Sequence, residues 1–480
     1  MFVGTGSDVG KSWIVAGVCR WLRNKKYQPA PFKAQNMSLN SYATPSGHEI
    51  GRAQAVQAEA CGISCSYHMN PVLLKPSSVN KSQVVLNGMP IGSQTAKEYF
   101  LGEDKKHLFE EAKKGFNYLN ENFSPVVMEG AGSISELNLK HRDIVNMRMA
   151  EAANACVYLI ADIDRGGVFA SVYGSIELLE DWERALVKGI IINKFRGDAT
   201  LFEDGKLMLE KLTGLPVIGV VPFAKDIHLE EEDSVALSIR NKVPVEGKVN
   251  IAVVHLNYMS NYTDFQPFEY QEEVNLFYTR NPRDLKRADV LIIPGTKNTI
   301  GDLESLKEDG IDKVILSEVG KKPIIGICGG YQMMGSEISD PFQVESNLGS
   351  ISGLGIFEGK TILSKEKHSV QTKFKFKNHA EECQGYEIHM GETEIYEDSA
   401  LNLIEGKPEG FFDGEKCWGS YIHGIFENNV IFQDLFKSIN VELATQESYK
   451  EAKERNYNLL GNHIDNHLDM NAIIKDIEAC

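Results

Sequence analysis

The sequence has no long hydrophobic run and no excess of positive charge. Its apolar stretches, such as residues 290–294 and 189–192, have the length of strands, whereas a membrane-spanning helix needs about 20 apolar residues. The 50 basic residues are outnumbered by 67 acidic ones, which gives a net charge of −17. A chain of this charge repels nucleic-acid phosphates and anionic lipids. We therefore expect no membrane insertion and no nucleic-acid partner.

Cysteine is sparse, and no secretory leader is recognisable. The eight cysteines are scattered over 480 residues, without the dense spacing of a secreted disulfide scaffold. Cys61, Cys65 and His68 lie close together, but no second ligand pair follows at zinc-like spacing. No basic region or cleavage motif precedes Gly4. These absences predict reduced thiols and a cytoplasmic location.

Two α/β domains are predicted from the order of apolar runs. The chain is longer than a single typical core, and strand-like runs alternate with helical stretches, which favours parallel sheets covered by helices. We expect a first domain over residues 1–224, a linker over 225–248, a second domain over 249–437 and a polar helical tail over 438–480. No internal repeat or low-complexity segment is present.

The chain opens with a phosphate-binding loop, GTGSDVGKS at residues 4–12. Its backbone N–H groups, including that of Gly10, would bind phosphate oxygens, Lys11 would reach the β and γ phosphates, and the Ser12 hydroxyl would ligate Mg²⁺. Five residues separate Gly4 from Gly10, one more than in the usual pattern. Because only three residues precede Gly4, where a longer strand is normal, a natural start upstream of Met1 stays open at this point.

Three further polar residues follow apolar runs in the first domain. Glu129 closes the run 126–128 and is predicted to hold the metal directly or through water. Lys33 follows a short apolar run and would steady a phosphate or a carboxylate. Asn193 follows the run 189–192 and would contact the nucleotide base. Together they predict an ATP and Mg²⁺ site at the carboxyl edge of a parallel sheet.

Cys328 is the strongest catalytic candidate in the second domain. It stands in GICGGYQ at residues 326–332, directly after an apolar run and before two glycines. A sharp turn from a strand into a helix exposes such a side chain, and a helix N-terminus favours the thiolate, which is the nucleophilic form. We therefore predict a nucleophile elbow rather than an inert core thiol.

A strand-end histidine completes the predicted thiol site. His423, in YIHG at residues 421–424, is expected to act as the general base for Cys328, with His389 as a rival. The amide of Gly329 and a donor from the loop 294–297 are predicted to form an oxyanion hole. The chain thus combines a nucleotide site with a site for covalent catalysis.

These motifs together resemble the cobyric acid synthase family of class I glutamine amidotransferases. The resemblance is carried by the elbow, the YIHG run, the segment KAQNMSLNS at 33–41 and DIDRGGVF at 162–169, and it covers nearly the whole chain. The spacing of the phosphate-binding loop is similar to that of dethiobiotin synthetase, and this likeness implies a first domain of that fold. The resemblance to class I glutamine amidotransferases implies a flavodoxin-like second domain. The resemblance implies that ATP and L-glutamine drive amidation of the b, d, e and g carboxylates of adenosylcobyrinic acid a,c-diamide, a corrinoid. We also expect residues 36–41 and 162–167 to line the synthetase site.

The sequence departs from ordinary class I glutaminases at one position. Those enzymes carry a glutamate two residues after the histidine, where this chain has Ile425. Glu427 lies two positions further on, and nothing in the sequence brings it to His423. We therefore expect a Cys–His dyad, as the resemblance also implies.

Two other interpretations remain at this point. The same machinery would suit another acceptor, as in cobyrinic acid a,c-diamide synthase or a ligase that amidates a cell-wall precursor. A different class of protein, a P-loop ATPase switch with a non-catalytic second domain, would leave Cys328 idle.

Overall fold

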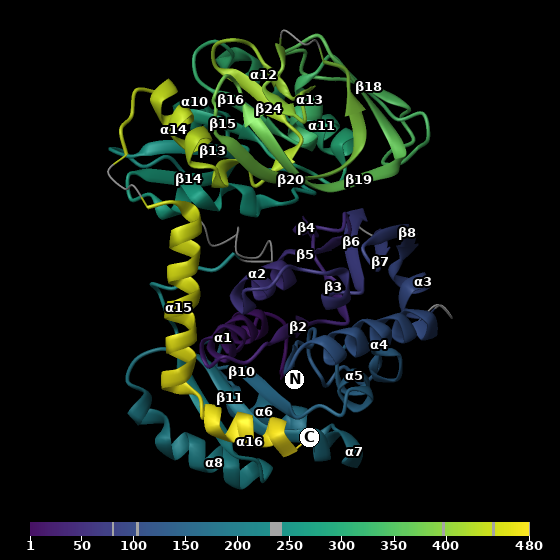
Figure 1. Ribbon diagram of the computed structural model, residues 1–480, viewed down its shortest axis with the longest axis vertical. Coiled ribbons are helices and arrows are strands. Elements are labelled where there is room, and N and C mark those ends of the chain that lie inside the picture. The colour runs from purple at the N-terminus through teal and green to yellow at the C-terminus, as the bar shows by residue number, and fades with distance from the viewer. Residues whose placement is uncertain (79–80, 102–104, 231–241, 396–398, 444–446, 480) are drawn as a thin grey trace.

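The fold was analysed on a computed structural model, which describes residues 1–78, 81–101, 105–230, 242–395, 399–443 and 447–479. Figure 1 shows two bodies. One is built from the first half of the chain together with the last two helices, and the other from residues 249–443. Both ends of the described chain lie in the N-terminal body. Of the expected linker 225–248, residues 231–241 lie outside the described part.

The N-terminal body is built on a parallel sheet. Strand β10 is buried along its whole length, as expected when helices cover both faces of a sheet. A bridge between Phe2 and Glu129 joins the pair β2–β9 to the four strands β1-β10-β11-β12. The strands are β1 (Phe2–Gly4), β2 (Ala30–Phe32), β9 (Val126–Met128), β10 (Val157–Asp162), β11 (Val187–Phe195) and β12 (Val217–Pro222). The helices are α1 (Lys11–Asn24), α2 (Arg52–Cys61), α4 (Lys105–Asn122), α5 (Met147–Ala152), α6 (Val168–Glu177), α7 (Asp181–Leu186) and α8 (Glu203–Thr213).

The first strand is short but fully integrated. Phe2, Val3 and Gly4 pair in parallel with residues 158–160 of β10, and the Met1 amino group donates to the Cys156 carbonyl at 2.6 Å. The phosphate-binding loop therefore follows directly from a strand of the sheet.

A small insertion extends the N-terminal body toward the C-terminal body. It contains a four-stranded sheet of order β3-β6-β7-β8 and the hairpin β4–β5. The hairpin contacts strands of the C-terminal body, notably β20. The bounds are β3 (Gln35–Met37), β4 (Ser41–Ala43), β5 (Glu49–Gly51), β6 (Val72–Ser78), β7 (Lys81–Leu86), β8 (Met89–Thr95) and α3 (Ala96–Leu101).

The C-terminal body contains a second sheet that is parallel except at one edge. Its order is β14-β13-β15-β16-β24-β23, and only β23 runs antiparallel to its neighbour. The strands are β13 (Val249–Val254), β14 (Val274–Thr279), β15 (Val290–Ile293), β16 (Ile324–Ile327), β23 (Phe411–Phe412) and β24 (Cys417–Ser420). The helices are α10 (Pro282–Arg287), α11 (Thr299–Glu308), α12 (Ile311–Glu318), α13 (Gly329–Met334) and α14 (Asn429–Ser438). The expected α/β fold with parallel sheets in both halves is confirmed.

A mainly antiparallel sheet is added beside this core. Its path is β18-β17-β19-β20-β25, and the long pair β19–β20 forms most of it. The strands are β17 (Glu337–Ser339), β18 (Ser350–Ser352), β19 (Lys360–Phe376), β20 (Glu382–Thr393), β25 (Ile422–His423) and the outlying β21 (Asn402–Ile404) and β22 (Lys407–Glu409). The 3₁₀ segments that bear on the site are η4 (Tyr262–Tyr270) and η6 (Ile425–Glu427).

The polar C-terminal segment returns to the N-terminal body. Helices α15 (Tyr449–His467) and α16 (Met470–Ala479) run from the C-terminal body down to the parallel sheet (Figure 1). Leu460 and Ile464 are fully buried against α1, and a Cβ atom added at Gly17 would collide with Ile464. The expected helical tail is therefore part of the N-terminal core, a placement that its polar sequence did not predict.

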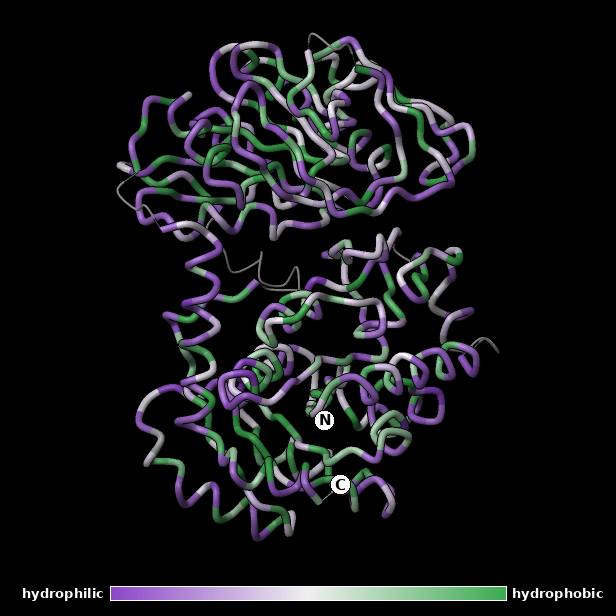
Figure 2. The backbone as a smooth tube through the Cα atoms, viewed as in Figure 1, coloured by the Kyte–Doolittle hydropathy of each residue, from purple (hydrophilic) through white to green (hydrophobic). Residues whose placement is uncertain are grey.

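Apolar residues collect in the interiors of both bodies. In Figure 2 the most hydrophobic stretches follow the central strands of each sheet, whereas α8 and α15 alternate between polar and apolar residues. None of the helices in the described part of the chain combines the length and the apolar character that a bilayer crossing requires. Among the residues that the structure describes, six cysteines are free, namely Cys19, Cys61, Cys65, Cys328, Cys383 and Cys417. Cys156 is disulfide-bonded, so the expectation of reduced thiols is wrong for that residue.

The substitution Ile464→Ala should destabilise the protein, because it leaves a cavity between α15 and α1. We expect the free energy of unfolding to fall by about 2–5 kcal/mol, measured by urea denaturation. The matched control is Leu459→Ala on the same helix, where the side chain is 40% exposed and the expected change is about 0.5 kcal/mol or less. Equal effects of the two substitutions would contradict the docking of α15.

Candidate active sites

The loop between β1 and α1 is shaped to bind phosphate. Gly10 has a φ of +90°, and a Cβ atom there would collide with the Asn193 amide, so glycine is required. The Lys11 ammonium donates to the carbonyls of Gly6 at 2.9 Å and Gly132 at 3.0 Å. Its charge therefore lies over the loop, at the N-terminus of α1, where anions bind.

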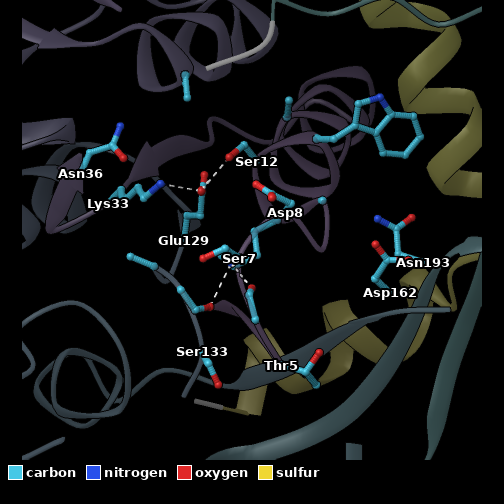
Figure 3. Close-up of a pocket in the computed structure, with 18 of the residues that line it drawn as sticks. Thr5, Ser7, Asp8, Ser12, Lys33, Asn36, Glu129, Ser133, Asp162 and Asn193 are labelled. Atoms are coloured by element: carbon cyan, nitrogen blue, oxygen red, sulfur yellow. Dashed lines mark hydrogen bonds and ion pairs between the residues drawn. The ribbon is translucent and has the colours of Figure 1, made fainter. Parts of the chain in front are cut away.

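Glu129 connects the loop to three neighbouring side chains. Its carboxylate accepts hydrogen bonds from Ser12 Oγ at 2.8 Å, Lys33 Nζ at 2.8 Å and Gln57 Nε2 at 2.6 Å, and Figure 3 shows the first two. Burial alone would raise the pKa of Glu129, but the Lys33 ammonium and these hydrogen bonds hold it below its usual value. A hydroxyl oxygen and an ionised carboxylate at this spacing are oxygen donors of the kind that Mg²⁺ prefers. The pair Ser12 and Glu129 therefore fits the expected metal.

Asn193 and Lys194, near the end of β11, hold the phosphate-binding loop through hydrogen bonds. The Asn193 amide donates to the Val9 carbonyl at 2.8 Å, and Lys194 bridges the Asp8 carbonyl and the Asp162 carboxylate. Asn193 thus lies beside the phosphate-binding loop, and its NH₂ group holds the loop. The contact of Asn193 with the nucleotide base stays a prediction.

A cavity of about 1690 Å³ extends from the loop across the N-terminal body. It is lined by the loop, Lys33, Glu129 and Asp162, and Asn36 of the segment 36–41 also reaches it (Figure 3). Several cations line the same space, namely Lys105, Lys140, Arg142, Arg148, Arg165, Lys194 and Arg196. Four of them are paired with acids of the same lining, Lys140 with Glu183, Arg165 with Asp8, Lys194 with Asp162 and Arg196 with Asp164. A space of this size admits a nucleotide together with a second large molecule.

Cys328 occupies a strained turn at the end of β16. Its backbone has φ 49° and ψ −109°, a conformation that non-glycine residues rarely adopt and that is common at functional positions. A side chain at Gly330 would collide with the Ile293 carbonyl, so the helix can start here only with a glycine. The elbow predicted from the GICGG run is therefore present in the backbone.

His423 is the histidine that partners the thiol. It lies on β25, 2% exposed, and lines one small cavity together with Cys328. Burial lowers the pKa of His423, but the Asp264 charge and the interaction with Cys328 raise it to about 10. The rival His389 directs Nδ1 to the Gly391 carbonyl at 2.7 Å and Nε2 to the Glu387 carboxylate at 3.2 Å.

The structure places a carboxylate beside His423 that the expected Cys–His dyad did not include. Asp264 Oδ2 lies 2.7 Å from His423 Nδ1, although the two residues are 159 positions apart in the chain. Glu427 instead faces Arg52 at 3.7 Å and Lys453 at 4.0 Å. No motif in the sequence singles out Asp264, because only the packing of η4 against β25 brings it to the histidine.

Both bodies form the wall of the thiol cavity. Ser41 and Lys75 come from the N-terminal insertion, and Lys297 and Glu345 come from the C-terminal body. Burial raises the pKa of Glu345 to about 7. The loop 294–297, which is predicted to supply an oxyanion donor, lies next to His423. A Cβ atom added at Gly295 would lie 3.4 Å from the His423 ring.

Comparison with known proteins agrees with this pair of sites. Residues 1–235 match the CobQ/CobB/MinD/ParA nucleotide binding domain, and residues 250–431 match the CobB/CobQ-like glutamine amidotransferase domain. A cobyric acid synthase of Parabacteroides distasonis is 51% identical over 488 residues, which cover 100% of this chain and 98% of that protein.

The chain belongs to the cobyric acid synthase family.

Other members of the family are similar over equally long stretches. The cobyric acid synthase of Bacteroides fragilis is 51% identical over 98% of this chain and 96% of its own length. That of Caldanaerobacter subterraneus is 44% identical over 100% of this chain and 98% of its own length. A solved glutamine amidotransferase aligns with 40% of this chain and 99% of its own at 14% identity and a TM-score of 0.32, which is too distant to add to the assignment.

The substitution Glu129→Gln should abolish the gain in ATP affinity that Mg²⁺ provides, because a neutral amide is a poor ligand for this cation. We expect ammonia-dependent amidation to fall at least about 100-fold, while glutamine hydrolysis persists. Calorimetric titration with ATP, with and without Mg²⁺, gives the direct measurement. Glu151→Gln, an exposed position on α5, is the control. A Glu129→Gln variant with an unchanged Mg²⁺ effect would remove Glu129 from the metal site.

Proposed function

We propose that this protein amidates the b, d, e and g carboxylates of adenosylcobyrinic acid a,c-diamide with ATP and glutamine, giving adenosylcobyric acid in cobalamin biosynthesis. The observation that carries the proposal is the presence, on one chain, of a strained Cys328–His423 site and a loop with Lys11, Ser12 and Glu129. The names of the relatives, 51% identical over full length, support the acceptor.

The thiol site would release ammonia from glutamine. The Cys328 thiolate attacks the side-chain carboxamide, and the amide of Gly329 together with the 294–297 loop stabilises the oxyanion. The His423 imidazolium donates its proton to the leaving nitrogen, so that ammonia departs and a thioester remains. His423 then accepts a proton from water, which hydrolyses the thioester to glutamate and regenerates Cys328.

The synthetase site would activate the acceptor. Lys11 and the loop amides orient the ATP phosphates, and Lys33 steadies the Glu129 carboxylate. When bound at Ser12 and Glu129, Mg²⁺ would neutralise phosphate charge. A corrinoid carboxylate attacks the γ phosphorus and releases ADP, and ammonia then displaces phosphate from the acyl phosphate to form the amide. Asn193 serves this site by holding the loop.

The size of the large cavity supports a bulky acceptor, and individual cations on its wall can bind carboxylates. The protein carries a net charge of −17, yet Lys105, Arg142 and Arg148 gather around this cavity. Local cations attract an anionic substrate that the rest of the surface would repel. Because four carboxylates react in turn, the space must also accept the same molecule in different orientations.

We assign the synthetase domain to residues 1–224, the linker to 225–248, the amidotransferase domain to 249–437 and the helical tail to 438–480. The separate hydrophobic cores of the two bodies support this division. The tail shares the synthetase core. A cytoplasmic location agrees with the substrates, which are cellular metabolites.

The deciding experiment incubates the protein with adenosylcobyrinic acid a,c-diamide, Mg²⁺-ATP and either glutamine or ammonia, and follows the corrinoid by mass spectrometry. Stepwise conversion of acids to amides is expected with both nitrogen donors. The Cys328→Ser variant should lose at least about 100-fold with glutamine and keep its rate with ammonia.

Two other outcomes would point elsewhere. An unchanged corrinoid with continued glutamine hydrolysis would keep the glutaminase and reject the acceptor, and cobyrinic acid, the acceptor of the a,c-diamide synthase, would be tested next. Nucleotide-dependent dimerisation without glutamine hydrolysis would instead indicate the ATPase switch.

A further inference from the structure

We infer that Asp264 is the positioning residue of the glutaminase site and takes the role of the acid that is absent at Ile425. The inference rests on the proposed function of Cys328 and His423, and it replaces the expected dyad by a triad whose acid comes from a different part of the chain. Asp264 belongs to η4, which follows β13, whereas Ile425 lies just after the histidine.

The geometry of Asp264 is that of an orienting carboxylate. Its side chain is 2% exposed, and one oxygen lies 2.7 Å from His423 Nδ1. The other oxygen accepts the backbone N–H of Gly424 at 2.9 Å. Both oxygens are therefore engaged on one side of the histidine, which fixes the ring orientation and places the Nδ1 proton toward the acid, leaving Nε2 to the thiol.

Asp264 is itself held by the N-terminal body. The backbone N–H of Tyr262 donates to Asn40 Oδ1 at 3.1 Å, and Asn261 Oδ1 accepts the backbone N–H of Ser41 at 2.9 Å. The start of η4 is thus tied to the segment 36–41, for which the sequence predicted only a place in the synthetase site. The position of the acid depends on contact between the two bodies.

Tyr386 on β20 packs against the face of the His423 ring. Its ring stacks on His423 with centroids 5.4 Å apart and an interplanar angle of 27°, and its hydroxyl donates to the Ser41 carbonyl at 3.2 Å. The titratable groups that face His423 are accordingly Asp264 from η4, Cys328 from the elbow and Tyr386 from β20. Of these, Asp264 is the group that lies within hydrogen-bond distance of Nδ1.

The acid has two chemical consequences. It stabilises the imidazolium that forms when His423 takes a proton, and it raises the pKa of His423 to about 10. With a neutral amide in its place, that pKa should fall. An asparagine can also donate to Nδ1 and so select the tautomer with its proton on Nε2, which cannot accept a proton from the thiol.

The test compares Asp264→Asn with Asp264→Glu, Glu427→Gln and the unchanged protein. Glutamine hydrolysis is measured as kcat and KM across pH, and the His423 ring is titrated by NMR with ¹⁵N-labelled histidine. For Asp264→Asn we expect kcat to fall about 10²–10⁴-fold with KM nearly unchanged. The alkaline limb of the pH profile and the His423 titration should both move to lower pH.

The remaining variants separate positioning from folding. Asp264→Glu keeps the charge and should restore part of kcat, and Glu427→Gln, which removes a carboxylate that faces Arg52, should stay within about three-fold of the unchanged protein. An Asp264→Asn variant with a normal kcat, or with an unshifted His423 titration, would overturn the inference. The inference would also be overturned if kcat of Asp264→Asn fell only in proportion to the loss of folded protein, which thermal unfolding measures.

The readouts also distinguish this inference from the proposed function. Hydrolysis and the NMR titration need no corrinoid, so failure to amidate the acceptor would leave the test of Asp264 intact. Loss of glutamine hydrolysis in the unchanged protein would instead reject the glutaminase itself.

Discussion

The arrangement of both active sites depends on buried carboxylates that lie between cations of the two bodies. Glu49 is fully buried, and it is paired with Lys75 of its own body at 2.6 Å and with Lys367 of the other. Burial would raise the pKa of Glu49, but the two ammonium groups lower it. An ion pair of this kind adds little net stability, yet removing one partner costs about 3–5 kcal/mol. It therefore acts mainly by selecting one docked arrangement.

A second charged cluster closes the interface near α15. Glu230 accepts from Arg52 of α2 and pairs with Lys453 of α15 at 3.2 Å. Glu427 of the C-terminal body lies against the same cations. Helix α15 thus links three parts of the chain, since it leaves the C-terminal body, passes this cluster and ends in the core of the N-terminal body.

The docking has a direct consequence for chemistry. Ser41 and Lys75 line the cavity that holds Cys328, so ammonia would be released where the two bodies meet. Ser41 of the hairpin also binds Asn261 and the Tyr386 hydroxyl, and the Tyr386 ring stacks on His423. The N-terminal insertion is therefore connected to the histidine by a few hydrogen bonds and one stacked ring. This would link the two half-reactions without a long-range movement.

Elements whose chemistry is local could be identified from the sequence alone. The GTGSDVGKS loop and the GICGG elbow could be read directly, because glycine spacing, backbone geometry and the reactive side chain lie within a few residues of one another. Alternating apolar runs likewise predicted the parallel sheets. Glu129 could be placed because residues that follow parallel strands meet at one edge of a sheet. For Asn193 the same rule gave the location but not the bonding partner, since the Val9 carbonyl approaches it only in the folded loop.

The way in which distant segments complete these sites follows from the packing of the folded chain. Asp264 meets His423 across 159 positions, and no local pattern marks an aspartate within an aromatic segment as an orienting acid. The return of α15 to α1 depends on the fit of Ile464 against Gly17, a match of shapes that polarity and periodicity do not encode. Local sequence fixed the reactive groups, whereas their orientation, their charge environment and the joining of the two sites followed from packing between residues far apart in the chain.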